Sequence, residues 1–226
     1  MHANHFDPML KSISTGKKAT LLVVLVLLVD QAVKIWIKTH MFQYQNINIF
    51  GNWFRIYFIE NNGMAFGMEF GGSIGKTLLS IFRIAAVFGI VWYLRYLIKQ
   101  KANPGLIFSI ALVLAGAVGN IIDSMFYGII FNDSTPGTIA ALFPAGGGYS
   151  SFLHGKVVDM LYFPIINGHY PHWVPIVGGE EFQFFRPVFN LADSSITIGV
   201  AIILLFQKRF FGIRPVDSPT TQDNLQ

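Results

Sequence analysis

The sequence contains no cysteine and few charged residues. Without cysteine the chain can form no disulfide, thiol nucleophile or thiolate metal site, and it cannot itself be lipidated on cysteine. Only 12% of the 226 residues are charged, whereas soluble domains have ~25%. Since 53% of the residues are hydrophobic and the mean hydropathy is positive, the composition predicts an integral membrane protein that is mainly α-helical.

Several patterns of other protein classes are also absent. The formal net charge is +4, but the basic residues are scattered between apolar runs and form no stripe, so no nucleic-acid partner is expected. No H-E-x-x-H motif accompanies His154, His169 and His172, which leaves zinc binding as a weak alternative and no metal or other cofactor as the prediction. Ser194 and Ser195 lie outside any G-x-S-x-G context, so a serine hydrolase is a similarly weak alternative.

Four apolar segments, most of about twenty residues, are long enough to cross a membrane: about 19–38, 78–98, 106–124 and 190–208. In the third, Ala115 and Gly119 have the small-xxx-small spacing that permits close helix packing. The chain shows no internal repeat, and we expect one domain over residues 1–226, with residues 1–18 and 209–226 flanking the spans.

The distribution of basic residues predicts the orientation of these spans. Nine basic residues fall on the side of the two termini and the 99–105 connection, and four fall on the other side. Segments rich in basic residues are retained in the cytoplasm. Both termini and the 99–105 connection are therefore expected to be cytoplasmic. The first group comprises Lys11, Lys17, Lys18, Arg95, Lys99, Lys101, Lys208, Arg209 and Arg214; the second comprises Arg55, Lys76, Lys156 and Arg186.

Two outer segments connect the spans. In residues 40–75, aromatic and β-branched runs such as 54–59 are followed by the turn signal Asn61-Asn62-Gly63, which predicts a small extracytoplasmic β-structure at the membrane interface. Residues 129–189 form a long segment rich in glycine, proline and aromatic residues. A loop of this length is typical of a functional element.

Two acids on the outer side are candidate catalytic residues. Asp193 lies at the start of the fourth apolar segment, and Asp159 is flanked by apolar residues. Ionisable groups at such positions are costly and often functional. Two carboxylates that share a site cannot both ionise easily, so one can act as acid while the other activates water. The alternative is that Asp159 is a loop acid and Asp193 a helix cap.

A further pair lies in the first span. Asp30 and Lys34 are four residues apart and therefore lie on one helix face. We interpret them as a mutually neutralising pair that supports the structure, with a direct chemical role as the alternative.

The sequence also resembles the lipoprotein signal peptidases (signal peptidase II). Five blocks match the motifs of that family in order: 30–34 (DQAVK), 61–67 (NNGMAFG), 116–123 (GAVGNIID), 157–159 (VVD) and 189–194 (FNLADS).

The resemblance implies an aspartic endopeptidase of the bacterial inner membrane with its active site facing the extracytoplasmic side. Its substrates would be prolipoproteins that carry diacylglycerol on a cysteine, cut on the amino-terminal side of that cysteine. Membrane lipids would be further partners, and the cyclic peptide globomycin would be an inhibitor. The family's catalytic aspartates fall on Asp159 and Asp193, and its supporting residues fall on Asp30, Lys34, Asn61, Gly63, Asn120, Asp123, Asn190 and Ala192.

Two features depart from the family pattern. Ser124 stands where most members have arginine after the aspartate of the third block, which puts the supporting role of Asp123 in doubt. Residues 129–154 are an insertion in a connection that the family keeps short. We interpret this insertion as a mobile flap, with an inert surface loop as the alternative.

Two functions outside the peptidases are compatible with intramembrane acids. A transporter or channel would use the same acids as a proton or cation site, but transporters usually show repeated halves and broken helices at mid-membrane. A non-catalytic membrane scaffold would not need paired acids.

Overall fold

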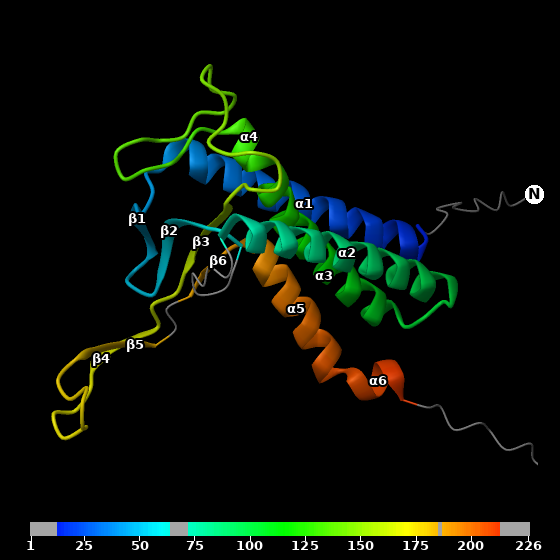
Figure 1. Cartoon of the computed structure of the whole chain (residues 1–226). Coiled ribbons are helices and arrows are strands. Elements are labelled where there is room, and N and C mark those ends of the chain that lie inside the picture. Colours follow the sequence, from blue (N-terminus) through cyan, green and yellow to red (C-terminus); the bar gives the residue numbers. More distant parts are fainter. Residues whose placement is uncertain (1–12, 64–71, 185–186, 213–226) are drawn as a thin grey trace, which may run out of the picture.

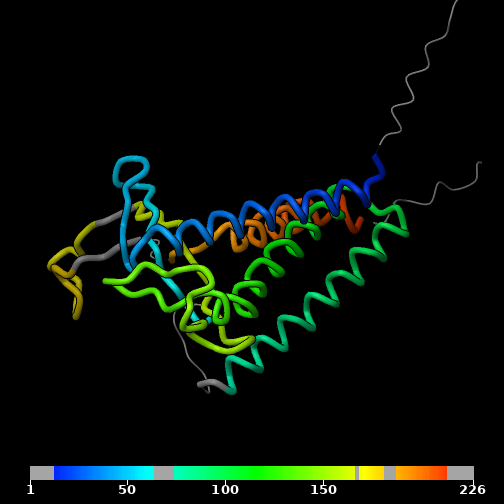
Figure 2. The backbone as a smooth tube through the Cα atoms, turned by 90° about the horizontal axis from the view of Figure 1, so that it is seen from above, coloured from blue at the N-terminus to red at the C-terminus, as the bar shows by residue number. Residues whose placement is uncertain are grey.

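The computed structural model describes residues 13–63, 72–184 and 187–212. Its main helices are α1 (Thr15–His40), α2 (Gly72–Lys99), α3 (Pro104–Ile122) and α5 (Leu191–Leu205). These helices form one bundle, and the strands gather at one end of it (Figures 1 and 2). The start of α1, the α2–α3 connection and the end of α5 lie at the opposite end. This arrangement places the segments predicted to be cytoplasmic on the same side.

Three helices are long and apolar enough to cross a membrane. They are Thr15–His40, Ile74–Lys99 and Pro104–Ile130, with mean hydropathies of 2.1, 1.9 and 2.2. Three of the four predicted spans are therefore present as such helices, and the third extends six residues beyond its predicted end at 124.

The fourth predicted span, 190–208, is not one long helix. α5 has 15 residues and ends at Leu205, and a separate short helix, α6 (Gln207–Phe211), follows. At 1.5 Å per residue α5 is ~22 Å long, which is shorter than the ~30 Å of a bilayer's hydrocarbon core. The structure thus shows three helices of spanning length and one shorter apolar helix among the described residues.

Small residues allow α5 to pack closely on α3. A Cβ atom added to Gly116 would lie 2.1 Å from the carbonyl oxygen of Ala192, and one added to Gly119 would lie 3.1 Å from the Cβ of Ala192. The Ser195 hydroxyl donates to the carbonyl of Leu112 at 2.8 Å. The predicted close helix contact is confirmed, with Gly116 at the closest approach instead of Ala115.

The predicted outer β-structure is a four-stranded antiparallel sheet. Its order is β1 (Asn46–Phe50), β2 (Phe54–Asn61), β3 (Val157–Tyr162) and β6 (Val188–Phe189). The run 54–59 lies in β2, as expected. β4 (Ile166–His169) and β5 (Glu181–Phe184) form a separate hairpin beyond the main sheet (Figure 1).

The turn after β2 is only partly described. Gly63 has a φ of 84°, a conformation that glycine adopts without strain. The rest of the 61–67 motif, from residue 64, lies outside the described residues, as do the terminal segments 1–12 and 213–226.

The two faces of β2 and β3 have different environments. Side chains alternate between the faces of a strand, and Ile59 pairs with Asp159. Phe58, Val158 and Met160 are fully buried on the face away from Asp159, where they pack with residues from the end of α1. The hydrophobic core of the outer region therefore lies behind the strand that carries Asp159.

The insertion belongs to this core. After α3 the chain continues through a π-helical turn, η2 (Asp123–Tyr127), and the short helix α4 (Gly128–Ile130). Phe131 and Ala140, both within the insertion, are 0% and 3% exposed and pack with Phe58 and Met160. This packing contradicts the flap interpretation for the anchored part of the segment, because a mobile flap would not supply buried core residues.

Candidate active site

Asp193 is held in the first turn of α5 by a capping box. The Asn190 side-chain oxygen accepts a hydrogen bond from the Asp193 N–H at 2.9 Å, and the Asp193 carboxylate accepts one from the Asn190 N–H at 3.4 Å. A carboxylate here also interacts favourably with the helix dipole. The helix cap is thus Asn190, and Asp193 lies three residues later with its Oδ1 atom accepting a hydrogen bond from Asn120 Nδ2 at 2.7 Å.

Asp159 lies in the middle of β3 and is 5% exposed. Its Oδ1 atom accepts a hydrogen bond from Asn190 Nδ2 at 2.7 Å, and its Oδ2 atom accepts one from the Asn61 side-chain amide. Burial, followed by the negative charge of Asp193, raises the pKa of Asp159 from 3.8 to about 8, while the Asn190 hydrogen bond acts in the opposite direction.

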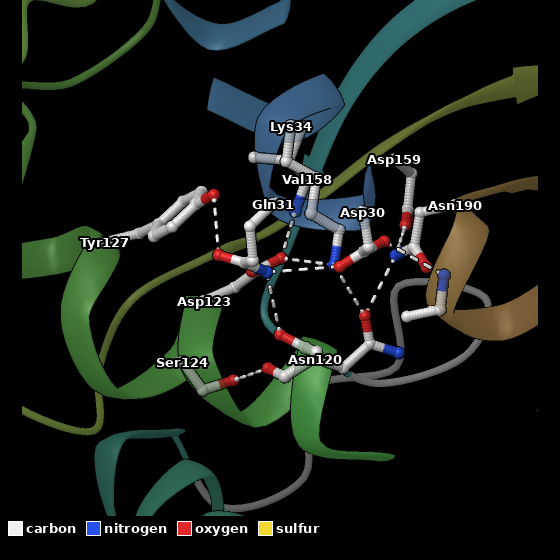
Figure 3. Close-up of polar contacts among 12 residues, drawn as sticks. Asp30, Gln31, Lys34, Asn120, Asp123, Ser124, Tyr127, Val158, Asp159 and Asn190 are labelled. Atoms are coloured by element: carbon white, nitrogen blue, oxygen red, sulfur yellow. Dashed lines mark hydrogen bonds and ion pairs between the residues drawn. The ribbon is translucent and has the colours of Figure 1, made fainter. Parts of the chain in front are cut away.

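Two asparagine side chains connect the two aspartates. Asn190 contacts both acids, and its Nδ2 atom also donates to Asn120 Oδ1 at 3.0 Å. Asn120 in turn donates to Asp193. The structure therefore brings Asp159 and Asp193, which are 34 positions apart in the sequence, into one polar cluster (Figure 3 shows Asp159, Asn190 and Asn120).

A second cluster surrounds the ammonium group of Lys34, which is 0% exposed. Lys34 Nζ lies 3.0 Å from Asp30 Oδ2 and 2.8 Å from Asp123 Oδ2, and it donates to Asn120 Oδ1 at 3.0 Å (Figure 3). The expected Asp30–Lys34 pair is present, and Asp123 completes it. Asn120 joins this cluster to Asp159 and Asp193, the candidate catalytic pair, which is called the dyad below.

Asp123 is paired with a cation although Ser124 stands where the resemblance led us to expect an arginine. Lys34 supplies the positive charge, and the Ser124 hydroxyl instead donates to the carbonyl of Asn120 at 3.1 Å. Ser124 is 4% exposed, so it lies inside the bundle. A supporting position for Asp123 is thus compatible with serine at 124.

The carboxylates beside Lys34 also bind the backbone next to each aspartate of the dyad. Asp30 Oδ1 accepts from the N–H of Ala192 at 3.0 Å, and Asp123 Oδ2 accepts from the N–H of Val158 at 3.3 Å (Figure 3). Ala192 and Val158 directly precede Asp193 and Asp159 in the sequence. Lys34 therefore pairs with two carboxylates, one of which binds the backbone of the helix that carries Asp193 and the other the backbone of the strand that carries Asp159.

Two further residues of this cluster, Gln31 and Tyr127, are not among the site residues predicted from the sequence. Gln31 Nε2 donates to Asp123 Oδ1 at 2.9 Å and to Asp30 Oδ2 at 3.1 Å, and its Oε1 atom accepts from the Tyr127 hydroxyl at 3.1 Å (Figure 3). The only sequence signal for Gln31 was its place within the 30–34 block. Tyr127 had no such signal, because its position depends on the π-helical turn.

Arg83 was also left without a role, as a basic residue inside a span. Its guanidinium donates to the carbonyl of Gly63 and interacts electrostatically with Asp193. A Cβ atom added to Gly63 would lie 2.5 Å from Arg83 Nη1. The N–H of Gly63 donates to Asn61 Oδ1 at 2.5 Å, so this turn connects Arg83 with the asparagine that binds Asp159.

The described residues show no arrangement that supports the serine hydrolase or the zinc-binding alternative. The hydroxyls of Ser194 and Ser195 donate to the backbone carbonyls of Asn190 and Leu112, as is common within and between helices. In the described parts of the chain, no group of three or more histidine, aspartate or glutamate side chains is arranged to hold a metal ion.

Comparisons with known proteins identify the family of the chain. The family model described as signal peptidase (SPase) II matches residues 22–209. A lipoprotein signal peptidase of Porphyromonas gingivalis is 46% identical over 221 residues, which cover 95% of this chain and 96% of the relative. One of Amoebophilus asiaticus is 40% identical and covers 80% of this chain and 74% of its own length.

Two solved structures share the fold. Both are described as bacterial membrane enzymes. One aligns with a TM-score of 0.57 and 24% identity over 89% of this chain and 94% of its own, and the other with a TM-score of 0.56 and 27% identity over 84% and 92%. Taken with the three apolar helices and the five ordered motif blocks, the extent of these matches shows that the chain is a membrane protein of the lipoprotein signal peptidase (signal peptidase II) family.

Proposed function

We propose that the chain is an aspartic endopeptidase that uses Asp159 and Asp193 to cleave diacylglyceryl-modified prolipoproteins on the amino-terminal side of the lipidated cysteine. The observation that carries the proposal is the shared asparagine, Asn190, which binds both carboxylates. Burial and the charge of Asp193 raise the pKa of Asp159 to about 8, so that this acid keeps a proton at neutral pH. A protonated and an ionised carboxylate together satisfy the requirement for direct attack by water.

The chemistry follows from these protonation states. Asp193 removes a proton from a water molecule, the resulting hydroxide attacks the carbonyl carbon of the scissile bond, and Asp159 donates its proton to the carbonyl oxygen. The C–N bond of the tetrahedral gem-diol intermediate then breaks as the proton held by Asp193 passes to the amide nitrogen and one hydroxyl proton returns to Asp159, which restores both carboxyl groups to their starting states. The products are a carboxylic acid and an amine, and no covalent intermediate with the enzyme forms.

The remaining residues have positioning roles in this proposal. Asn61, Asn120 and Asn190 orient the carboxylates through hydrogen bonds. Asp30, Asp123 and Lys34 hold the backbone beside the dyad, where Ala192 offers an N–H and a side chain small enough for the contact with Gly119. Gly63 allows the turn that carries Asn61 to contact Arg83.

We further propose a single domain over residues 1–226 that crosses the bacterial inner membrane four times, with both termini cytoplasmic and the dyad on the extracytoplasmic side. α5 and α6 together would form the fourth crossing. The acyl chains of the substrate would lie among the spans, and globomycin would compete with the substrate at the dyad.

Replacing either aspartate of the dyad should abolish cleavage. Asp159→Asn and Asp193→Asn each remove an acid or a base, and general acid–base catalysis contributes ~10² to 10⁴ in rate. The measurement is cleavage of a diacylated prolipoprotein by purified protein in detergent, with and without globomycin. Ser194→Ala is the matched control and should retain activity. Near-normal turnover in either aspartate variant would show that the dyad assignment is wrong.

The pH dependence should show an alkaline limb set by Asp159. Because its pKa is raised to about 8, the protonated form that the mechanism requires is present below that pH and is lost as the pH rises through it. The value of kcat/KM should therefore fall above about pH 8. A profile that stays flat to pH 10, on protein that remains folded, would contradict the role of Asp159 as the acid.

Asp30→Asn should affect stability more than the rate per folded molecule. Lys34 is completely buried, and loss of one carboxylate leaves its charge incompletely compensated; removal of one partner from a buried ion pair costs about 3–5 kcal/mol. We expect a lower melting temperature and yield, measured in detergent, with smaller change in kcat of the folded fraction. A fully folded but inactive Asp30→Asn protein would instead indicate a direct chemical role.

The absence of native cysteine allows the topology to be tested with single-cysteine variants. Ile176→Cys, at the exposed end of the β4–β5 hairpin, should react with a membrane-impermeant maleimide on intact spheroplasts. Gln100→Cys and Gly212→Cys should react only after the membrane is permeabilised. Labelling of Gly212→Cys on intact spheroplasts would contradict the fourth crossing.

A further inference from the structure

We propose that the insertion is a positioning element of the active site. It contacts Glu60 on the back face of the sheet and thereby positions the Asn61 side chain for its hydrogen bond to Asp159. The inference rests on the proposed function only in that it takes Asp159 to be a catalytic residue. Its own basis is a second buried ionic network, separate from the Lys34 cluster, to which α1, β2 and the insertion all contribute.

The centre of this network is an ion pair between Lys38 and Glu60. Both side chains are 0% exposed. Ser134, an insertion residue that is 2% exposed, contacts both: its hydroxyl accepts from Lys38 Nζ at 2.8 Å and donates to Glu60 Oε1 at 3.3 Å. Buried charges are costly unless they are paired, and Glu60 Oε2 is buried without a hydrogen-bond partner in the described part of the chain. Lys38 and the Ser134 hydroxyl of the insertion therefore hold Glu60 through its Oε1 atom.

Asp133 and Tyr149 of the insertion, together with Lys156 just after it, complete the network on its outer side. Lys156 Nζ lies 3.9 Å from Glu60 Oε2 and 2.8 Å from Asp133 Oδ1, and the Lys156 N–H donates to the Tyr149 hydroxyl at 2.6 Å. The ring of Tyr149 contacts both ammonium groups, with its centroid 5.1 Å from Lys38 Nζ and 5.2 Å from Lys156 Nζ. Such cation–π contacts stabilise the lysines where water is excluded.

The network reaches the dyad through the end of β2. Glu60 and Asn61 are the last two residues of this strand, and consecutive side chains point to opposite faces. The back of the sheet therefore receives Glu60, and the front receives Asn61, whose amide donates to Asp159 Oδ2. The register pairs Glu60 with Val158 and Asn61 with Val157, so a shift of Glu60 also displaces the strand end beside Asp159.

The close packing of the insertion permits little adjustment. A Cβ atom added to Gly155 would lie 2.1 Å from the carbonyl oxygen of Asp123, and the Gly155 N–H donates to the carbonyl of Ser124 at 2.9 Å. At the other end of the segment, Gln43, just after α1, donates its N–H to the carbonyl of Thr135 at 3.2 Å. The insertion is thus attached to both elements that support the Lys34 cluster.

The test compares Ser134→Ala with Ser109→Ala, which removes an equally buried hydroxyl, 1% exposed, from α3 far from β2. Kinetics on a diacylated prolipoprotein should show kcat reduced ~3- to 100-fold in Ser134→Ala, as expected when a catalytic group is misplaced by up to ~1 Å, with little change in KM. Ser109→Ala should keep the wild-type kcat.

The pH profile distinguishes positioning from loss of stability. The charged groups that face Asp159 are Asp193 from α5, Lys34 from α1 and Asp123 from η2, and Ser134→Ala changes none of them. A weakened Asn61 hydrogen bond removes a donor that favours the ionised form of Asp159, so the alkaline limb should move upward by as much as ~1 unit. Ser109→Ala should leave the limb unchanged.

A measurement independent of activity separates this inference from the proposed function. The carboxyl carbon of Asp159 can be titrated by NMR in protein labelled with ¹³C-aspartate and assigned by its absence in Asp159→Asn. A wild-type pKa and kcat in folded Ser134→Ala would overturn the inference. If that variant fails to fold, Tyr149→Phe decides instead, because it removes from the insertion, without a change of charge, a hydroxyl that accepts a hydrogen bond from the Lys156 N–H; it should shift the Asp159 titration in the same direction. If the wild type cleaves no prolipoprotein, the titration still decides the inference.

Discussion

The buried charge of Lys34 is the constraint on which the rest of the active site depends. An ammonium group that is 0% exposed within a helical bundle requires nearby carboxylates, because an uncompensated charge in such a place is strongly destabilising. Asp30 and Asp123 meet this requirement. Since each carboxylate also accepts a backbone hydrogen bond beside one of the two dyad residues, the compensation of one charge positions both halves of the site.

The two aspartates of the proposed dyad lie in different kinds of local structure. Asp193 belongs to the first turn of a helix, where capping and the helix dipole favour a carboxylate. Asp159 lies in the middle of a strand, where burial raises its pKa to about 8. Asn190 contacts both and is itself 0% exposed. The proposed mechanism uses this raised pKa of Asp159, because direct attack by water requires one carboxyl group that keeps its proton.

The candidate site and the residues that pack behind it lie on opposite faces of the sheet. Its front face carries Asn61 and Asp159, and its back face carries Phe58, Glu60, Val158 and Met160 against α1 and the insertion. A strand that bears a catalytic group can remain rigid only if its opposite face is packed. The insertion occupies that opposite face, which explains why it contributes core residues such as Phe131.

The sequence by itself determined the class of the protein, three helices of spanning length and the strand at 54–59, and its ordered motif blocks predicted Asp159 and Asp193 as the catalytic pair. These features are local: hydropathy, period and motif spacing are properties of short segments. Even the Asp30–Lys34 pair follows from the four-residue period of one helix.

Only the tertiary structure decided which distant groups meet. Asp123 as a partner of Lys34, Gln31 as a donor to Asp123, and Ser134 between Lys38 and Glu60 are contacts between residues 74 to 96 positions apart in the sequence. The interruption of the fourth apolar segment after Leu205 and the core position of the insertion were likewise not visible in hydropathy, because neither depends on composition. Each depends on which surface the folded chain presents to that segment, and a linear pattern contains no information about that surface.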